Sequence, residues 1–136
     1  MKPNSRFSMA VHLMTALVYL DEKSSSGLLS KSVNTNPVVI RRLLGELNRA
    51  GLIRAVRGKQ GGFMLARDAK KISLLDIYRA VNGDEGLVSL HDNPENRACA
   101  VSCKVRGVLA KHLHKAQGVF ERELGQVVLA DIEKAM

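Results

Sequence analysis

One short stretch of this sequence, Asn34-Thr35-Asn36-Pro37, fixes where a helix must begin. The Asn36 side chain can accept a hydrogen bond from a free backbone N–H, and Pro37 suits the first helical position, where its missing N–H costs nothing. Gly51 can end the helix in a left-handed conformation. The pattern therefore predicts an amphipathic helix between Asn36 and Gly51 with these residues at core spacing: Ile40, Leu43, Leu44 and Leu47.

The other face of this predicted helix is polar and cationic, and it carries Val38, Arg41, Arg42, Gly45 and Arg49. A recognition helix needs such a face near its N-terminus, because guanidinium groups one turn in can reach guanine edges or phosphates. An ordinary amphipathic surface helix would look the same. The helix alone therefore leaves both interpretations open.

The segment after this helix has the pattern of a β hairpin. Residues 52–57 and 63–66 are short β-type runs, and they flank a glycine-rich turn. Basic side chains surround that turn, and an arginine beside it would suit the narrow minor groove of DNA. A nucleotide phosphate loop does not fit, because these glycines precede a strand and not a helix. The hairpin favours DNA binding through Arg54, Arg57 and Lys59.

The other segments complete a winged helix-turn-helix order. We expect helices near residues 6–20 and 28–33, a helix from a capping box at Ser73 to about Val81, and an irregular loop over 83–97. A long helix should start at Cys103 or Lys104, and a short one should cover 129–134. The expected fold is mainly α with a small β hairpin, divided into a winged helix-turn-helix domain (1–83), a sensor loop (84–104) and a dimerisation helix with a C-terminal helix (105–136).

The long helix predicts a homodimer. Its apolar line is longer than so small a domain can easily cover by itself, so a second copy would supply the missing partner. Such a dimer would present two recognition helices to successive major grooves, which predicts an imperfectly palindromic operator. The line consists of Val105, Leu109, Leu113, Ala116, Phe120, Leu124 and Val127.

Charge is segregated along the chain. The formal net charge is +8, but residues 1–71 hold 13 Lys/Arg against 4 Asp/Glu, whereas residues 72–136 hold 8 against 9. A concentrated cationic excess suits a polyanion, because each neutralised phosphate releases condensed counterions. No nucleophile–base set or metal-ligand array indicates an enzyme. No membrane-spanning run or signal-peptide layout is present either, so we expect a cytoplasmic protein with reduced cysteines and no membrane partner.

Several motifs together resemble one known family. They are residues 32–44, Ala50-Gly51-Leu52-Ile53, Val56-Arg57-Gly58, Gly61-Gly62-Phe63, Leu65-Ala66 and Ile72-Ser73-Leu74. This pattern is similar to the bacterial Rrf2 family of regulators, whose better-known kinds are IscR, NsrR and CymR, and most of all to its YwnA-like branch. The resemblance implies a dimeric winged-helix repressor or activator that senses redox state, nitric oxide, iron–sulfur status or a metabolite. It also implies that Arg57 enters the minor groove and that the residues facing DNA include Asn36, Val38, Arg41 and Arg42.

The sensor loop departs from the family pattern. Iron–sulfur members resemble one another in having three cysteines there, but this chain has Cys99 and Cys103 alone. A cluster needs four ligands, and His12 is a candidate because some members recruit a ligand other than cysteine from the first helix. Thiol chemistry, a cluster and simple packing all stay open, and the effector is unknown. No cofactor is needed for the fold.

Two further alternatives depend on structure. The chain could be a winged-helix module for protein–protein contact without specific DNA binding, although the basic residues of the helix and hairpin argue against it. For the cysteines, an irregular segment 99–103 would let the two sulfurs reach bonding distance. A helical segment would make a relaxed disulfide between Cys99 and Cys103 hard to form.

Overall fold

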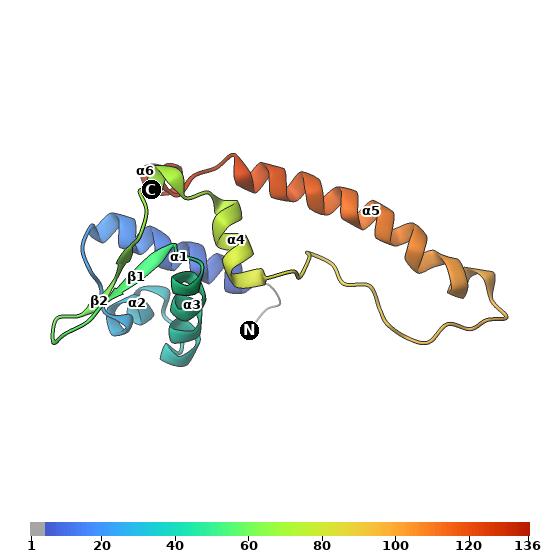
Figure 1. Cartoon of the computed structure of the whole chain (residues 1–136), viewed down its shortest axis with the longest axis horizontal. Coiled ribbons are helices and arrows are strands. Elements are labelled where there is room, and N and C mark those ends of the chain that lie inside the picture. The colour runs from blue at the N-terminus through green and yellow to red at the C-terminus, as the bar shows by residue number, and fades with distance from the viewer. Residues whose placement is uncertain (1–4) are drawn as a thin grey trace.

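A computed structural model describes residues 5–136, so the first four residues of the expected DNA-binding domain lie outside the described part. The element order confirms the predicted fold class, a mainly helical chain with one small hairpin (Figure 1). An additional short 3₁₀ turn lies between hairpin and capping box. The elements are α1 (Ser5–Leu20), α2 (Ser26–Val33), α3 (Pro37–Arg49), β1 (Ile53–Val56), β2 (Gly62–Leu65), η1 (Ala69–Lys71), α4 (Leu74–Asn82), α5 (Ala100–Gly125) and α6 (Leu129–Lys134).

The core lies among the first four helices and α6. Helix α1 contributes Ala10, Leu13 and Met14, which are fully buried, and it contacts α2, α3, α4 and α6. The four apolar residues predicted for the inner face of α3 are also fully buried. Their burial explains why α3 keeps a fixed orientation, since each large apolar side chain stabilises the fold by about 1.5–3 kcal/mol when it leaves water.

The turn between α2 and α3 is fixed by local hydrogen bonds. Asn34 adopts the left-handed conformation with φ 61°, which ends α2. The Ser30 hydroxyl donates to the Thr35 carbonyl at 2.9 Å, and Asn36 then caps α3. The free backbone groups at the end of α2 and at the start of α3 thus find hydrogen-bond partners within residues 30–36. These local contacts fix how α3 is oriented relative to α2.

The hairpin is antiparallel, with Ile53 paired to Leu65 and Val56 paired to Gly62. An additional bridge joins Ser24 to Phe63 through two backbone hydrogen bonds of 2.9 and 2.8 Å. A Cβ on Gly62 would lie 2.5 Å from the Ser24 carbonyl oxygen, so only glycine allows this approach. Strand β2 is therefore held against the body as far as Gly62 and Phe63, and only the turn before them projects from it.

Helix α5 and the loop before it form an arm, defined as residues 84–125. In Figure 1 the loop runs from α4 to the far end of α5, and α5 then returns to the body. The helix begins at Ala100, about one turn earlier than expected, because the Cys99 sulfur caps it by accepting from the Ser102 N–H at 3.5 Å. None of the α5 residues is buried, and only its inner end packs on α4, where Phe120 meets Tyr78 edge to face at 5.3 Å.

No helix among the described residues is both long enough and apolar enough to cross a membrane.

Candidate nucleic-acid interface and cysteine site

The outer face of α3 offers basic side chains on a rigid support. The Asn36 side chain accepts from the Val38 N–H at 2.8 Å, so the first turn is closed as predicted. Val38, Arg41 and Arg42 are all exposed, while the opposite face is buried in the core. The helix therefore presents two guanidinium groups to solvent one turn from its N-terminus.

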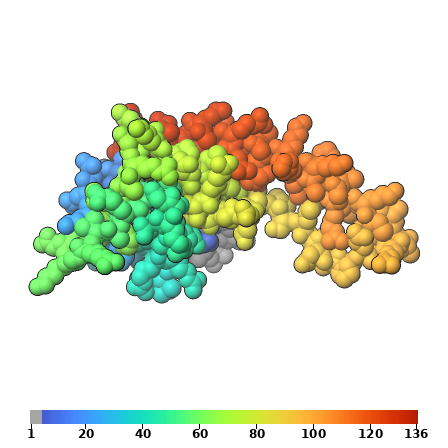
Figure 2. Space-filling model, in the orientation of Figure 1, coloured from blue at the N-terminus to red at the C-terminus, as the bar shows by residue number. Residues whose placement is uncertain are grey.

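The tip of the hairpin, residues 57–60, is exposed and includes Arg57 and Lys59. Arg54 is exposed on β1, opposite Met64. In Figures 1 and 2 the hairpin extends beyond the body on the same lower side as the start of α3. The start of α3 and the tip of the hairpin, which is the wing of the expected fold, thus lie on one side of the molecule.

The basic side chains of α3 and the hairpin form no ion pairs with the described residues. Among the described residues, no carboxylate lies within 4 Å of Arg41, Arg42, Arg54, Arg57 or Lys59. The three ion pairs found in that part of the chain lie elsewhere and are Arg6–Glu46, Arg79–Glu121 and Arg106–Glu95. We refer to these five cations with Asn36 and Val38 as the basic face. Uncompensated charge of this kind suits a phosphate backbone.

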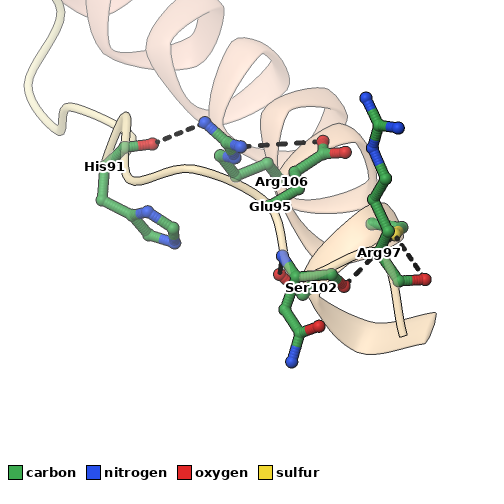
Figure 3. Close-up of polar contacts among 7 residues, drawn as sticks. His91, Glu95, Arg97, Ser102 and Arg106 are labelled. Carbon is green, nitrogen blue, oxygen red and sulfur yellow. Dashed lines mark hydrogen bonds and ion pairs between the residues drawn. The ribbon is translucent and has the colours of Figure 1, made fainter. Parts of the chain in front are cut away.

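The loop before α5 is tied to the first turns of that helix (Figure 3). Arg106 donates to the His91 carbonyl at 3.2 Å and forms an ion pair with Glu95 at 3.6 Å. The Asn96 N–H donates to the Ser102 hydroxyl at 2.8 Å. These contacts hold the loop around the N-terminus of α5, where the two cysteines lie.

The cysteines occupy one helical turn. Cys99 is half-buried and Cys103 is exposed, and the Cys103 thiol lies 3.6 Å from the Asn96 carbonyl oxygen. The Cys103 N–H donates to the Cys99 carbonyl at 3.2 Å, as in a helix. The helical alternative therefore applies, and a relaxed disulfide between the two within one chain is hard to form. Since neither thiol is fully buried, core packing does not explain them.

The third candidate ligand, His12, is not brought to the cysteines within one chain. It lies on α1 in the body, and its Nε2 is 3.0 Å from the Ser32 hydroxyl, whereas the cysteines lie at the far end of the arm (Figure 1). In the part of the chain that the structure describes, no three His, Cys, Asp or Glu side chains are grouped as metal ligands. The described part of one chain therefore does not bring together the four ligands that an iron–sulfur cluster needs.

Two features were missed by sequence reasoning. The first is an apolar groove of about 600 Å³ between α1, α2 and α6, lined by Val11, Ala16, Tyr19, Leu28 and Ile132 among others. The first helix is apolar on most of its sides, which indicated that it has more apolar surface than one core-facing side needs. The second is Gln117 on α5, which accepts from the Leu87 N–H at 2.9 Å and donates to the Tyr78 hydroxyl at 3.1 Å. It links the loop, α5 and α4, a long-range contact with no local signal.

Comparisons with known proteins extend over nearly the whole chain. The family model Rrf2, described as "Iron-dependent Transcriptional regulator", matches residues 3–135. YwnA of Bacillus subtilis strain 168, named as an HTH-type transcriptional regulator, is 40% identical over 129 residues, which cover 95% of each chain.

Solved structures are similar over the same length. A crystal structure described as that of a DNA-binding protein matches 94% of this chain and 98% of its own, with 35% identity and a TM-score of 0.73. The crystal structure of the oxidised form of Staphylococcus aureus CymR matches 98% of this chain and 96% of its own, with 25% identity and a TM-score of 0.69. The similarity therefore includes the arm as well as α3 and the hairpin.

Proposed function

The chain belongs to the Rrf2 family of transcriptional regulators, and from this premise we propose that it is a homodimeric repressor of a specific, imperfectly palindromic DNA operator. Membership in that family identifies a regulator and not an enzyme. One observation carries the proposal: the basic face joins α3 and the wing on one side and has no carboxylate partner among the described residues. In our proposal α3 enters the major groove, and Arg57 enters the adjacent minor groove.

We assign one role to each of three consecutive segments of the chain. Residues 1–83 bind DNA, residues 84–104 sense a signal, and residues 105–136 dimerise. A regulator of this kind acts on the bacterial chromosome, hence in the cytoplasm.

Exposed apolar surface supports the homodimer. On the outer half of α5, Val105 is 42% exposed and Leu109 is 44% exposed, so the described residues of their own chain leave nearly half of each in solvent. The groove between α1, α2 and α6 is a second uncovered apolar surface on the body. A monomer would leave both in water, and a second copy can cover them by two-fold packing of the arms.

The position of the cysteines supports a thiol-based signal. Cys103 is exposed at the end of the arm, where an oxidant can reach it. Its thiol contacts the loop backbone at Asn96, and the same loop is bonded to α4 through Gln117 and Tyr78. Oxidation of Cys103 would add bulk and polarity at the loop and change how the arm meets the DNA-binding domain. CymR, which is known in an oxidised form, has a similar fold.

Selection and titration together test the DNA-binding proposal. A random 30-base-pair duplex library is enriched on the full-length protein, and binding of the selected duplex is measured with variants of the basic face. Enrichment of a two-fold related sequence, lost when the basic face is neutralised, supports the proposal. Enrichment of no sequence, with the dimer intact, would favour the rival reading of a winged-helix module for protein–protein contact.

A further inference from the structure

Val38 is an apolar side chain in the middle of the basic face. It is 46% exposed at the second residue of α3, whereas the next two residues, Val39 and Ile40, turn toward the core. The described residues of its own chain leave nearly half of its surface in solvent. Residues at the start of a recognition helix contact base edges and phosphates, and polar side chains suit both. An exposed branched apolar residue at this position therefore suggests a specific apolar contact in the proposed complex with DNA.

Helix geometry places Val38 beside the two arginines and ahead of them. Because successive residues turn by about 100°, Val38, Arg41 and Arg42 fall within an arc of about 100°, opposite the buried residues of α3. Helical side chains lean toward the N-terminus of their helix. The backbone of Val38 lies about one turn nearer the leading end of α3 than that of either arginine, and its short side chain stays close to that end.

In the major groove only one base presents an apolar group. Guanine, adenine and cytosine present hydrogen-bond donors or acceptors, and thymine alone presents a C5 methyl group. Valine placed against a polar base edge would leave that edge without the hydrogen bonds it makes to water. The chemistry of Val38 therefore selects thymine among the four bases.

We propose that Val38 is a specificity-determining residue that packs on the C5 methyl of one thymine in each operator half-site. This inference rests on the proposed function, because it takes α3 as the helix in the major groove. Arg41 and Arg42 follow Val38 by three and four residues, which is about 4.5–6 Å along the helix axis. At about 3.4 Å per base pair, the thymine lies within about two base pairs of the position that these arginines contact.

The test removes the methyl group from the DNA and the side chain from the protein. The probe is the duplex enriched by the wild-type protein, with each thymine replaced in turn by deoxyuridine, which lacks only the C5 methyl. Removing the contacted methyl from one half-site should weaken binding about fourfold, the value for one methyl-sized group that returns to water. Removing it from both half-sites should weaken binding about fifteenfold.

The Val38→Ala variant, which keeps a good helix former, should bind the thymine and deoxyuridine duplexes equally. The matched control is Val88→Ala, a substitution at a valine that is 61% exposed in the loop before α5, and it should discriminate as the wild type does. If wild type and Val38→Ala respond alike to every replacement, the inference is wrong while the DNA-binding proposal stands. If the wild type enriches no duplex at all, the proposed function itself fails.

Discussion

Arg6 on α1 holds Glu46, the one acidic residue of α3, away from the basic face. The Arg6 Nη2 lies 2.7 Å from both carboxylate oxygens of Glu46, and its Nη1 donates to the Val81 carbonyl at 2.9 Å. One guanidinium group thus joins α1, α3 and the end of α4. In the proposed complex it also neutralises a charge that would otherwise repel DNA from α3.

Replacement of Arg6 should therefore destabilise the fold. Arg6→Ala leaves the half-buried Glu46 carboxylate without its partner, and we expect the free energy of unfolding to fall by about 1.5–3 kcal/mol. Thermal or urea denaturation measures it. In the Arg6→Ala/Glu46→Gln double variant part of this loss should return, since the unpaired charge is gone. The Glu46→Gln single variant completes the comparison. If the double variant loses as much free energy of unfolding as the two single variants together, the two side chains do not interact.

Arg57 at the wing tip should contribute to affinity without contributing to stability. It is exposed and has no carboxylate within 4 Å among the described residues, so Arg57→Ala should leave the thermal midpoint unchanged. Loss of a desolvated groove contact should cost about 1–3 kcal/mol of binding free energy on the selected duplex. Titration by fluorescence anisotropy measures this. Arg122→Ala, an exposed arginine on α5, is the control, and equal affinity of the two variants would contradict a role for the wing.

Features encoded in a few adjacent residues were predictable. The start of α3 followed from Asn36 and Pro37, and the hairpin followed from two β-type runs around glycines, because caps and turns depend on local hydrogen bonds and backbone angles. The start of α5 was placed too late, since a cysteine such as Cys99 is not a common helix cap.

Features made by distant residues were not predictable. The contacts of Gln117 with Leu87 and Tyr78 span 30 and 39 residues, and the groove combines three separate helices. A single sequence carries no signal for the Gln117 contacts, and the apolar first helix indicates excess apolar surface but not which helices form the groove. The two elements of the proposed DNA-facing surface were easier to predict because one helix and one hairpin, adjacent in the chain, provide them.

A charge on the outer half of α5 should break the proposed dimer. Leu109→Asp changes an exposed side chain, so the monomer should still fold, but the carboxylate would be buried in a two-fold interface of the arms. We expect the dimer dissociation constant to rise at least tenfold in sedimentation at micromolar concentration, with weaker DNA binding. Lys111→Asp, at an exposed position about 200° around α5 from Leu109, is the control and should leave the dimer dissociation constant unchanged. A dimer of unchanged affinity in Leu109→Asp would place the interface elsewhere.

Oxidation should act through Cys103. We expect peroxide to change operator affinity of the wild type and to leave Cys103→Ser unaffected, because Cys103 is the exposed thiol and is bonded to the loop. Electrophoretic mobility shifts of both proteins, each reduced, oxidised or reconstituted with iron and sulfide, make the comparison. A wild-type response that survives in Cys103→Ser would move the sensor away from this cysteine.

The salt dependence of DNA binding tests the basic face most directly. For the wild type, the logarithm of the association constant should fall steeply with the logarithm of salt concentration, by about 0.9 for each neutralised phosphate. The Arg41→Ala/Arg42→Ala/Arg57→Ala variant should bind much more weakly and with a shallower slope. The matched control removes three exposed lysines from α5 and α6, Lys111, Lys115 and Lys134, and should keep the wild-type slope. A folded, dimeric triple arginine variant with the wild-type affinity and slope would contradict the account.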